Sequence, residues 1–206
     1  MATRRAERRR SNRVGSDERW MAIVEAGSRV FHRLGYAQTT LQDIAREVGI
    51  NRASLYYYVA DKEELLIAIL DEPVQRMTNE LRAIAELDLT PSERLRRAIE
   101  QHMIALEESY PDLFVFLAEN LPQLTTGSDR AIRANALEYR TLMTGVIEEG
   151  IASGDFRDDI DPHLAMLGLL GMLNWSHRWY ASDGAKTLQE IGEQFTAMFL
   201  DGLRSR

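Results

Sequence analysis

The sequence predicts an all-α protein. Apolar residues recur at helical spacing along nearly the whole chain, and no stretch shows the apolar–polar alternation of a half-buried strand. Helix starts are also marked, because a capping residue is followed three positions later by an acidic residue at several places. These pairs are Thr40 with Asp43, Asp61 with Glu64, Thr90 with Glu93, and Thr187 with Glu190.

The N-terminus is strongly basic. Residues 1–13 hold six arginines and one acidic residue, so we expect residues 1–15 to be a disordered arm in the free protein. A first helix is expected from about Asp17 to Leu34, where Gly35 stops it. Apolar side chains along one face of this helix predict that it packs behind the segment that follows.

Residues 40–58 form two short helices joined by a tight turn. Thr40 caps the first helix, and Gly49 ends it because glycine adopts the left-handed conformation without steric penalty. Asn51 then caps a second helix, Arg52 to Tyr58, with Leu55 turned inward. The spacing is that of a helix-turn-helix motif, and the alternative is an ordinary helical hairpin.

The exposed face of the second helix favours the DNA-binding alternative. It offers hydrogen-bond donors, small residues and aromatic rings but no acidic group: Asn51, Arg52, Ala53, Ser54, Tyr56 and Tyr57. Such a face suits a helix that lies against phosphates and base edges. A basic arm in front of such a helix is also typical of proteins that reach along the DNA backbone.

The segment GINRASLYYYVADKEEL, residues 49–65, resembles the hallmark of the TetR family of bacterial repressors. Asn51 stands where the family more often has Ser or Thr, and Val59 where it usually has Phe. The resemblance implies a ligand-responsive, homodimeric transcriptional regulator, most commonly a repressor. It also implies a helix-turn-helix domain at residues 16–62 and an effector-binding and dimerisation domain at residues 63–206, with about nine helices in all.

Within the motif we assign roles by chemistry. Arg52 is the candidate for contact with base edges, with Tyr57 beside it and Ala53 small enough for close approach. Phosphate contacts are expected from Thr40, Ser54, Tyr56 and Lys62. Double-stranded DNA with a near-palindromic operator is therefore the expected partner, since a dimer presents two recognition helices.

A long helix from Asp61 is expected to join the two domains. Its apolar stripe is interrupted by Pro73, which predicts a kink near Asp71. Further helices are expected from Pro91 to Tyr110, Leu113 to Leu121, Asp129 to Ala152, Pro162 to Ala181 and Leu188 to Gly202. We expect ligand in the C-terminal domain to tilt the kinked helix and so change the separation of the two recognition helices.

The helix from Pro162 to Ala181 is apolar on nearly all sides, which predicts burial on more than one side. One side would then face the core and the other a second subunit; the alternative is that this helix is the centre of a monomer. TetR-like proteins dimerise through their last two long helices. The expected interface residues are Leu164, Leu167, Gly168, Gly171, Ile191, Phe195, Met198 and Phe199.

A hydrophobic effector is expected in a cavity between the helices of the C-terminal domain. The candidate lining residues are Met103, Leu106, Phe114, Leu117, Tyr139, Met143, Met172, Trp175, Arg178 and Trp179, although a plain core would show the same stripes. The segment NWSHRWY is similar to one in TetR-like regulators of fatty-acid and steroid breakdown, several of which answer to acyl-CoA thioesters. Arg178 would pair with ligand phosphates or would simply cap a helix C-terminus.

Composition and missing motifs argue against several classes of protein: membrane proteins, secreted proteins, metalloproteins and enzymes. The net charge of −7 hides a basic N-terminal region, since residues 1–62 carry twelve basic and seven acidic side chains. The chain has no cysteine, no secretory signal and no apolar run long enough for a bilayer, so we expect a cytoplasmic protein without a membrane partner. The four histidines lack metal-ligand spacing, and catalytic motifs are missing, so we expect no enzyme, no cofactor and no metal. A helical interaction module without DNA binding is the remaining alternative.

Overall fold

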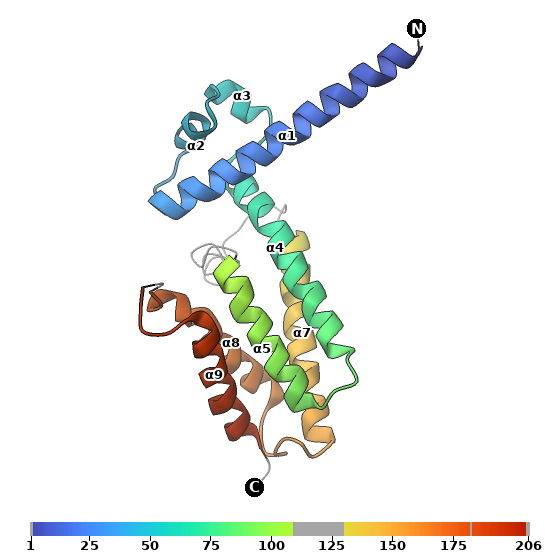
Figure 1. Ribbon diagram of the computed structural model, residues 1–206, viewed down its shortest axis with the longest axis vertical. Helices are drawn as coiled ribbons and strands as arrows, with labels where there is room; N and C mark the ends of the chain where they lie inside the picture. The colour runs from blue at the N-terminus through green and yellow to red at the C-terminus, as the bar shows by residue number, and fades with distance from the viewer. Residues whose placement is uncertain (1, 109–129, 182, 205–206) are drawn as a thin grey trace. The chain divides into compact units, whose positions relative to one another are not determined.

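The computed structural model describes residues 2–108, 130–181 and 183–204, and it confirms an all-α fold over that part of the chain (Figure 1). These residues form eight α-helices and one short 3-10 helix, and their one β-bridge is the isolated pair Phe156 and Arg204. The chain divides into two compact units, Met1–Leu70 and Asp71–Arg206. None of the described helices is long and apolar enough to cross a membrane.

The N-terminal unit contains α1 (Ala2–Leu34), α2 (Leu41–Val48), α3 (Arg52–Tyr56) and the first turns of α4 (Lys62–Ala85). Its core collects buried residues from each of these helices: Ile23, Val30, Phe31, Ile44, Ala45, Leu55, Leu65, Leu66 and Leu70. The unit therefore ends at Leu70 rather than at residue 62, because the first turns of α4 supply part of this core.

The start of α1 differs from the sequence prediction. The helix begins at Ala2 instead of near Asp17, so residues 2–15 continue it instead of forming a separate disordered arm. Alanine, arginine and glutamate are good helix formers. Adding turns to an existing helix also avoids the cost of a new nucleus.

The predicted linking helix is present as α4, and it runs without interruption through Pro73. Proline removes one backbone hydrogen bond here but does not end the helix. The boundary between the compact units falls between Leu70 and Asp71, close to this proline. The kink itself stays a prediction.

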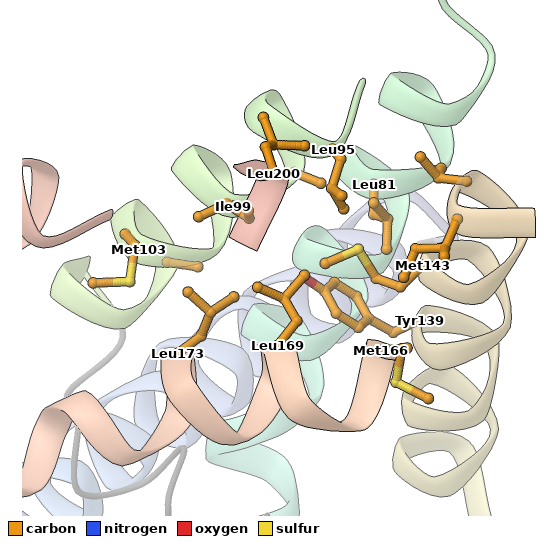
Figure 2. Packing of buried hydrophobic residues seen from close by; sticks show 14 of the residues in the cluster. Leu81, Leu95, Ile99, Met103, Tyr139, Met143, Met166, Leu169, Leu173 and Leu200 are labelled. Atoms are coloured by element: carbon orange, nitrogen blue, oxygen red, sulfur yellow. The ribbon is translucent and has the colours of Figure 1, made fainter. Parts of the chain in front are cut away.

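The C-terminal unit packs around α5 (Pro91–Glu108), which contacts α7 (Arg130–Ala152), α8 (Pro162–Trp175) and α9 (Leu188–Leu203). Figure 2 shows Leu95, Ile99 and Met103 of α5 among the buried side chains of the neighbouring helices. The predicted capping boxes at α2 and α9 are both present. The expected helix from Leu113 to Leu121 lies outside the described residues.

The apolar helix that was predicted to reach Ala181 is shorter in the structure. Helix α8 ends at Trp175, and the 3-10 helix η2 (Ser176–Arg178) follows it. The buried Ser176 hydroxyl donates to the Leu173 carbonyl oxygen at 2.6 Å. This bond uses a carbonyl near the end of α8, where local side-chain bonds compete with the regular helical pattern.

The turn between α7 and α8 depends on a close fit of Phe156 against Gly150. Phe156 is almost fully buried, and a Cβ added at Gly150 would overlap its ring. The next residue, Arg157, donates its backbone N–H to the Leu203 carbonyl oxygen at 2.8 Å and so joins this turn to the end of α9. Gly150 is therefore required for close approach rather than for an unusual backbone conformation.

Replacing Gly150 with alanine should lower the free energy of unfolding by about 1–3 kcal/mol, because the new methyl group displaces the Phe156 ring. Gly145→Ala on the same helix is the matched control, since its added Cβ meets nothing within 4 Å. That control should stabilise the protein by up to about 1 kcal/mol through helix propensity. Urea unfolding followed by circular dichroism measures both, and equal effects would contradict the assigned fit.

Candidate nucleic-acid interface

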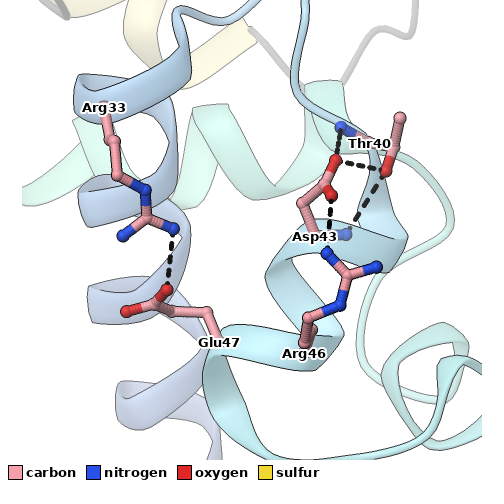
Figure 3. A network of polar contacts seen from close by, with 5 residues as sticks. All are labelled: Arg33, Thr40, Asp43, Arg46 and Glu47. Atoms are coloured by element: carbon pink, nitrogen blue, oxygen red, sulfur yellow. Dashed lines mark hydrogen bonds and ion pairs between the residues drawn. The ribbon is translucent and has the colours of Figure 1, made fainter.

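The N-terminus of α2 is fixed by a reciprocal capping box between Thr40 and Asp43 (Figure 3). The Thr40 hydroxyl and backbone N–H donate to Asp43 Oδ2 at 2.6 and 3.0 Å, and the Asp43 N–H donates to Thr40 Oγ1 at 3.3 Å. Hydrogen bonds from Thr40 hold the pKa of Asp43 below its usual range. Thr40 remains exposed, so the phosphate contact predicted for it is sterically possible.

Helix α2 is also tied to α1 by a charged cluster that sequence reasoning missed. Arg33 Nη2 donates to Glu47 Oε2 at 2.8 Å, and Arg29 Nε reaches Glu47 Oε1 at 3.5 Å (Figure 3 shows the Arg33 pair). The bond from Arg33 lowers the pKa of Glu47. Such surface pairs contribute little energy individually, but they select one packing of α2 against α1.

The turn into α3 follows the predicted pattern. Gly49 has φ +76°, and the Ile50 N–H donates to the Ala45 carbonyl oxygen at 2.9 Å. Asn51 Oδ1 accepts from the Ser54 N–H at 2.8 Å and caps α3. Leu55 is completely buried, so the opposite side of this short helix is turned outward.

The outward side of α3 carries the candidate base-reading group. Arg52 Nη2 donates to the Tyr56 hydroxyl at 2.9 Å, and its guanidinium carbon lies 5.2 Å from the centre of the Tyr56 ring. Tyr57 is 84% exposed, and Ala53 beside it is exposed as well. The structure therefore brings Arg52, Ala53, Tyr56 and Tyr57 onto one accessible surface, with Ser54 half-buried at its edge.

Lys62, for which a phosphate contact was predicted, is engaged within the protein in this structure. Its Nζ donates to the backbone carbonyl oxygens of Tyr36, Ala37 and Thr39 at 2.9, 3.1 and 3.2 Å. An ammonium has three N–H donors, and all three are engaged within the protein. Sequence reasoning could not find these partners because they lie more than 20 residues earlier in the chain.

The described members of the predicted effector set lie in two places. Met103, Leu106, Tyr139 and Met143 are buried in the core of the C-terminal unit, and Met172 packs against that core. Trp175, Arg178 and Trp179 are exposed around the end of α8. Phe114 and Leu117 lie outside the described residues. Whether these residues line an effector cavity stays a prediction, because a plain core shows the same apolar stripes.

A buried polar group lies within this core. His102 of α5 contacts the Tyr139 hydroxyl of α7 through Nδ1 at 2.9 Å and Asn174 Oδ1 of α8 through Nε2 at 3.1 Å. Burial lowers the pKa of His102 to about 4, so the ring is neutral at neutral pH. Because Oδ1 accepts, Nε2 carries the proton and Nδ1 accepts from Tyr139. No group of three or more His, Asp or Glu side chains in the described parts of the chain could hold a metal ion.

Exposed apolar residues follow one side of α8 and continue onto α9. Leu164 of α8 and Met198 of α9 are each 64% exposed. Leu167, one helical turn after Leu164 on α8, is exposed as well. Gly168 and Gly171 are exposed on α8, while Phe195 and Phe199 are half-buried on α9. Ile191, which was predicted at this surface, instead lies in the core, because its position on α9 faces α5. A hollow of about 530 Å³ lies between Leu164, Met172, Met198 and Phe199.

Two family models match consecutive parts of the chain. Residues 23–69 match the model described as "Bacterial regulatory proteins, tetR family", and residues 88–203 match "Tetracyclin repressor-like, C-terminal domain". The first match contains the helix-turn-helix described above, and the second covers more than half of the chain. The chain belongs to the TetR family.

Similar TetR-family proteins cover nearly the same length. The transcriptional repressor KstR2 of Rhodococcus jostii (strain RHA1) is 27% identical over 93% of this chain and 94% of its own length. The solved structure of KstR2 of Mycobacterium tuberculosis is 28% identical, covers 91% of this chain and 96% of that one, and has a TM-score of 0.79. The fatty acid metabolism regulator protein of Bacillus subtilis (strain 168) is 22% identical over 91% and 97% of the two chains.

As a TetR-family member with this exposed recognition surface, the protein is a ligand-responsive, DNA-binding transcriptional repressor. The helix-turn-helix predicted from residues 40–58 is thus confirmed as its DNA-binding element. The alternative of a helical interaction module without DNA binding is not favoured.

Arg52→Ala should weaken binding to a specific duplex by about 1–3 kcal/mol and relax sequence preference, because a base-edge contact is removed. The specific duplex can be selected by the protein from a random library, and fluorescence anisotropy compares it with a scrambled duplex. Arg140→Ala, an exposed arginine of α7, is the control for lost charge and should leave both affinities unchanged. Equal losses on the two duplexes would remove the assigned role of Arg52.

Proposed function

We propose that the protein represses transcription as a homodimer formed through α8 and α9. The supporting observation is the exposed apolar surface of Leu164, Leu167 and Met198, which is costly to leave in water. Gly168 and Gly171 lie on the same surface, and a Cβ added at either would meet nothing within 4 Å in the single chain. A partner helix is therefore able to approach the backbone of α8 closely at these points.

A two-fold dimer determines the kind of operator. Each subunit contributes one recognition helix, so the two α3 helices enter successive major grooves about one helical turn apart. The operator is then near-palindromic, with Arg52, Ala53 and Tyr57 at the base edges of each half-site. Thr40, Ser54 and Tyr56 lie against phosphates in this proposal. We assign the protein no catalytic activity and a cytoplasmic location.

Charged substitutions on the exposed apolar surface should convert the dimer to monomers. We expect Leu164→Glu combined with Met198→Glu to do so, because two desolvated carboxylates per subunit would face each other across the axis. Leu87→Glu, on a partly exposed leucine outside α8 and α9, is the matched control and should remain dimeric. Size-exclusion chromatography with light scattering measures the mass, and a double variant that stays dimeric would contradict the interface.

We further propose that the effector is a hydrophobic acid derivative such as an acyl-CoA thioester. Trp175 is 57% exposed, and the Arg178 guanidinium lies 5.0 Å from the centre of its ring. Aromatic rings beside a guanidinium suit a ligand with an acyl chain and phosphates. Support also comes from similar proteins that are named for ketosteroid regulation and fatty acid metabolism.

Release from DNA would follow from a change in α4. This helix begins in the N-terminal unit and continues in the C-terminal unit, so a bend in it would link effector binding to the helix-turn-helix. Pro73 weakens the backbone hydrogen bonding of α4 near the boundary between the units and makes this a suitable place to bend. An effector that binds one bend better than another shifts the population accordingly.

A thermal-shift panel tests the effector class. Acyl-CoAs should raise the unfolding temperature more than coenzyme A or the free fatty acid alone, since binding to the folded state stabilises it. Arg178→Ala should reduce the shift by acyl-CoAs, whereas Arg140→Ala should not. Stabilisation by planar drugs alone, with no response to any thioester, would eliminate this effector class while leaving the DNA-binding function intact.

A further inference from the structure

The geometry points to Lys62 as a positioning residue that holds the helix-turn-helix in place from the first turn of α4. In this proposal it makes no contact with DNA. The inference deepens the DNA-binding function and concerns how the turn before α2, residues 35–39, is fixed. Lys62 and this turn lie within the N-terminal unit.

The turn has several carbonyl groups outside regular helix. Gly35 adopts φ +75°, and the chain then passes through Tyr36 and Ala37 to Thr39. The three carbonyl oxygens of Tyr36, Ala37 and Thr39 converge on Lys62 Nζ at 2.9–3.2 Å. A single cation thus bonds three backbone carbonyls outside regular helix, and the Tyr36 carbonyl also accepts from the Thr39 N–H at 3.3 Å.

Aromatic packing extends this contact to α1. The Lys62 ammonium lies 4.5 Å from the centre of the Tyr36 ring, a cation–π distance, and that ring packs on Phe31 at 5.2 Å between centres. Phe31 is a residue of α1 that is buried in the core of the N-terminal unit. The first residue of α4 is therefore joined to the end of α1 through Tyr36.

The same contact determines where α2 begins. Thr39 is 2% exposed, its hydroxyl donates to the Gly35 carbonyl oxygen at 2.8 Å, and its own carbonyl accepts from Lys62. The next residue, Thr40, is the N-cap of α2. A shift of the turn would move this cap and with it the helix that supports α3.

The chemistry of the group distinguishes lysine from arginine. An ammonium directs three donors at tetrahedral angles from one atom, whereas a guanidinium directs its donors in one plane. Three carbonyls converging on one nitrogen suit the first and not the second. A phosphate contact would tolerate arginine, so the conservative substitution separates the two roles.

Lysine reactivity in the intact protein provides the first test. The chain has two lysines, Lys62 and the exposed Lys186. Under limited acetylation we expect Lys62 to react about tenfold more slowly than Lys186, because its nitrogen must first leave three carbonyls. Peptide mass spectrometry measures both rates, and equal rates would overturn the proposal.

DNA binding by Lys62→Met and Lys62→Arg provides the second test, with Lys186→Met as the control for lost charge. Both Lys62 variants should bind a duplex selected from a random library about tenfold more weakly than the unmodified protein. On a generic duplex, the slope of log affinity against log salt should stay unchanged for Lys62→Met. The control should match the unmodified protein in both measurements.

A phosphate contact gives the opposite pattern. Lys62→Met would then reduce the salt slope by about 0.9, and Lys62→Arg would bind both duplexes like the unmodified protein. That result would overturn the proposal and restore the role expected from the sequence. Circular dichroism at the assay temperature shows whether each variant is folded. If a Lys62 variant does not fold, the acetylation rates of Lys62 and Lys186 in the intact protein decide between the two roles.

Discussion

The recognition helix α3 is too short to be stable without the contacts that its neighbours make with it. Helix α3 has five residues, which is far below the length at which an isolated helix is stable in water. Its shape must therefore come from its surroundings: the Asn51 cap at one end, the left-handed Gly49 before it and the buried Leu55 beneath it. These contacts fix the outward side of α3, which carries Arg52, Ala53 and Tyr56.

Helices α1 and α4 contact α2 and the turn before it, and α2 packs against α3. Arg29 and Arg33 of α1 meet Glu47 of α2, and the first turn of α4 holds the turn that leads into α2. The exposed ion pairs of Glu47 contribute little stability individually. Together with the Lys62 bonds they connect α2 and the turn before it to α1 and α4, and α2 in turn packs against α3.

Local interactions explain what could be predicted from the sequence. The capping boxes, the Gly49 turn and the inward Leu55 each depend on residues within a few positions, so the helix-turn-helix and its family resemblance were readable directly. The sequence also predicted apolar residues on more than one side of α8, and Leu164 and Leu167 are exposed on it in the single chain. Their burial against a second subunit stays a prediction.

Contacts between distant segments explain what was missed. The carbonyls that bind Lys62 lie more than 20 residues before it, and nothing in its own segment indicates them. Ile191 sits on an apolar stripe, but only the packing of α9 on α5 shows that it faces the core. Core and cavity residues likewise share one composition, so the residues that line the effector site stay a prediction.

The central claim is that the surface around Arg52 and Tyr57 binds double-stranded DNA. Fluorescence anisotropy of a labelled generic duplex, titrated with the protein at low salt and again at rising salt, measures this directly. We predict measurable binding at low salt, with log affinity falling linearly as log salt rises. No measurable binding to the duplex at low salt would contradict the account.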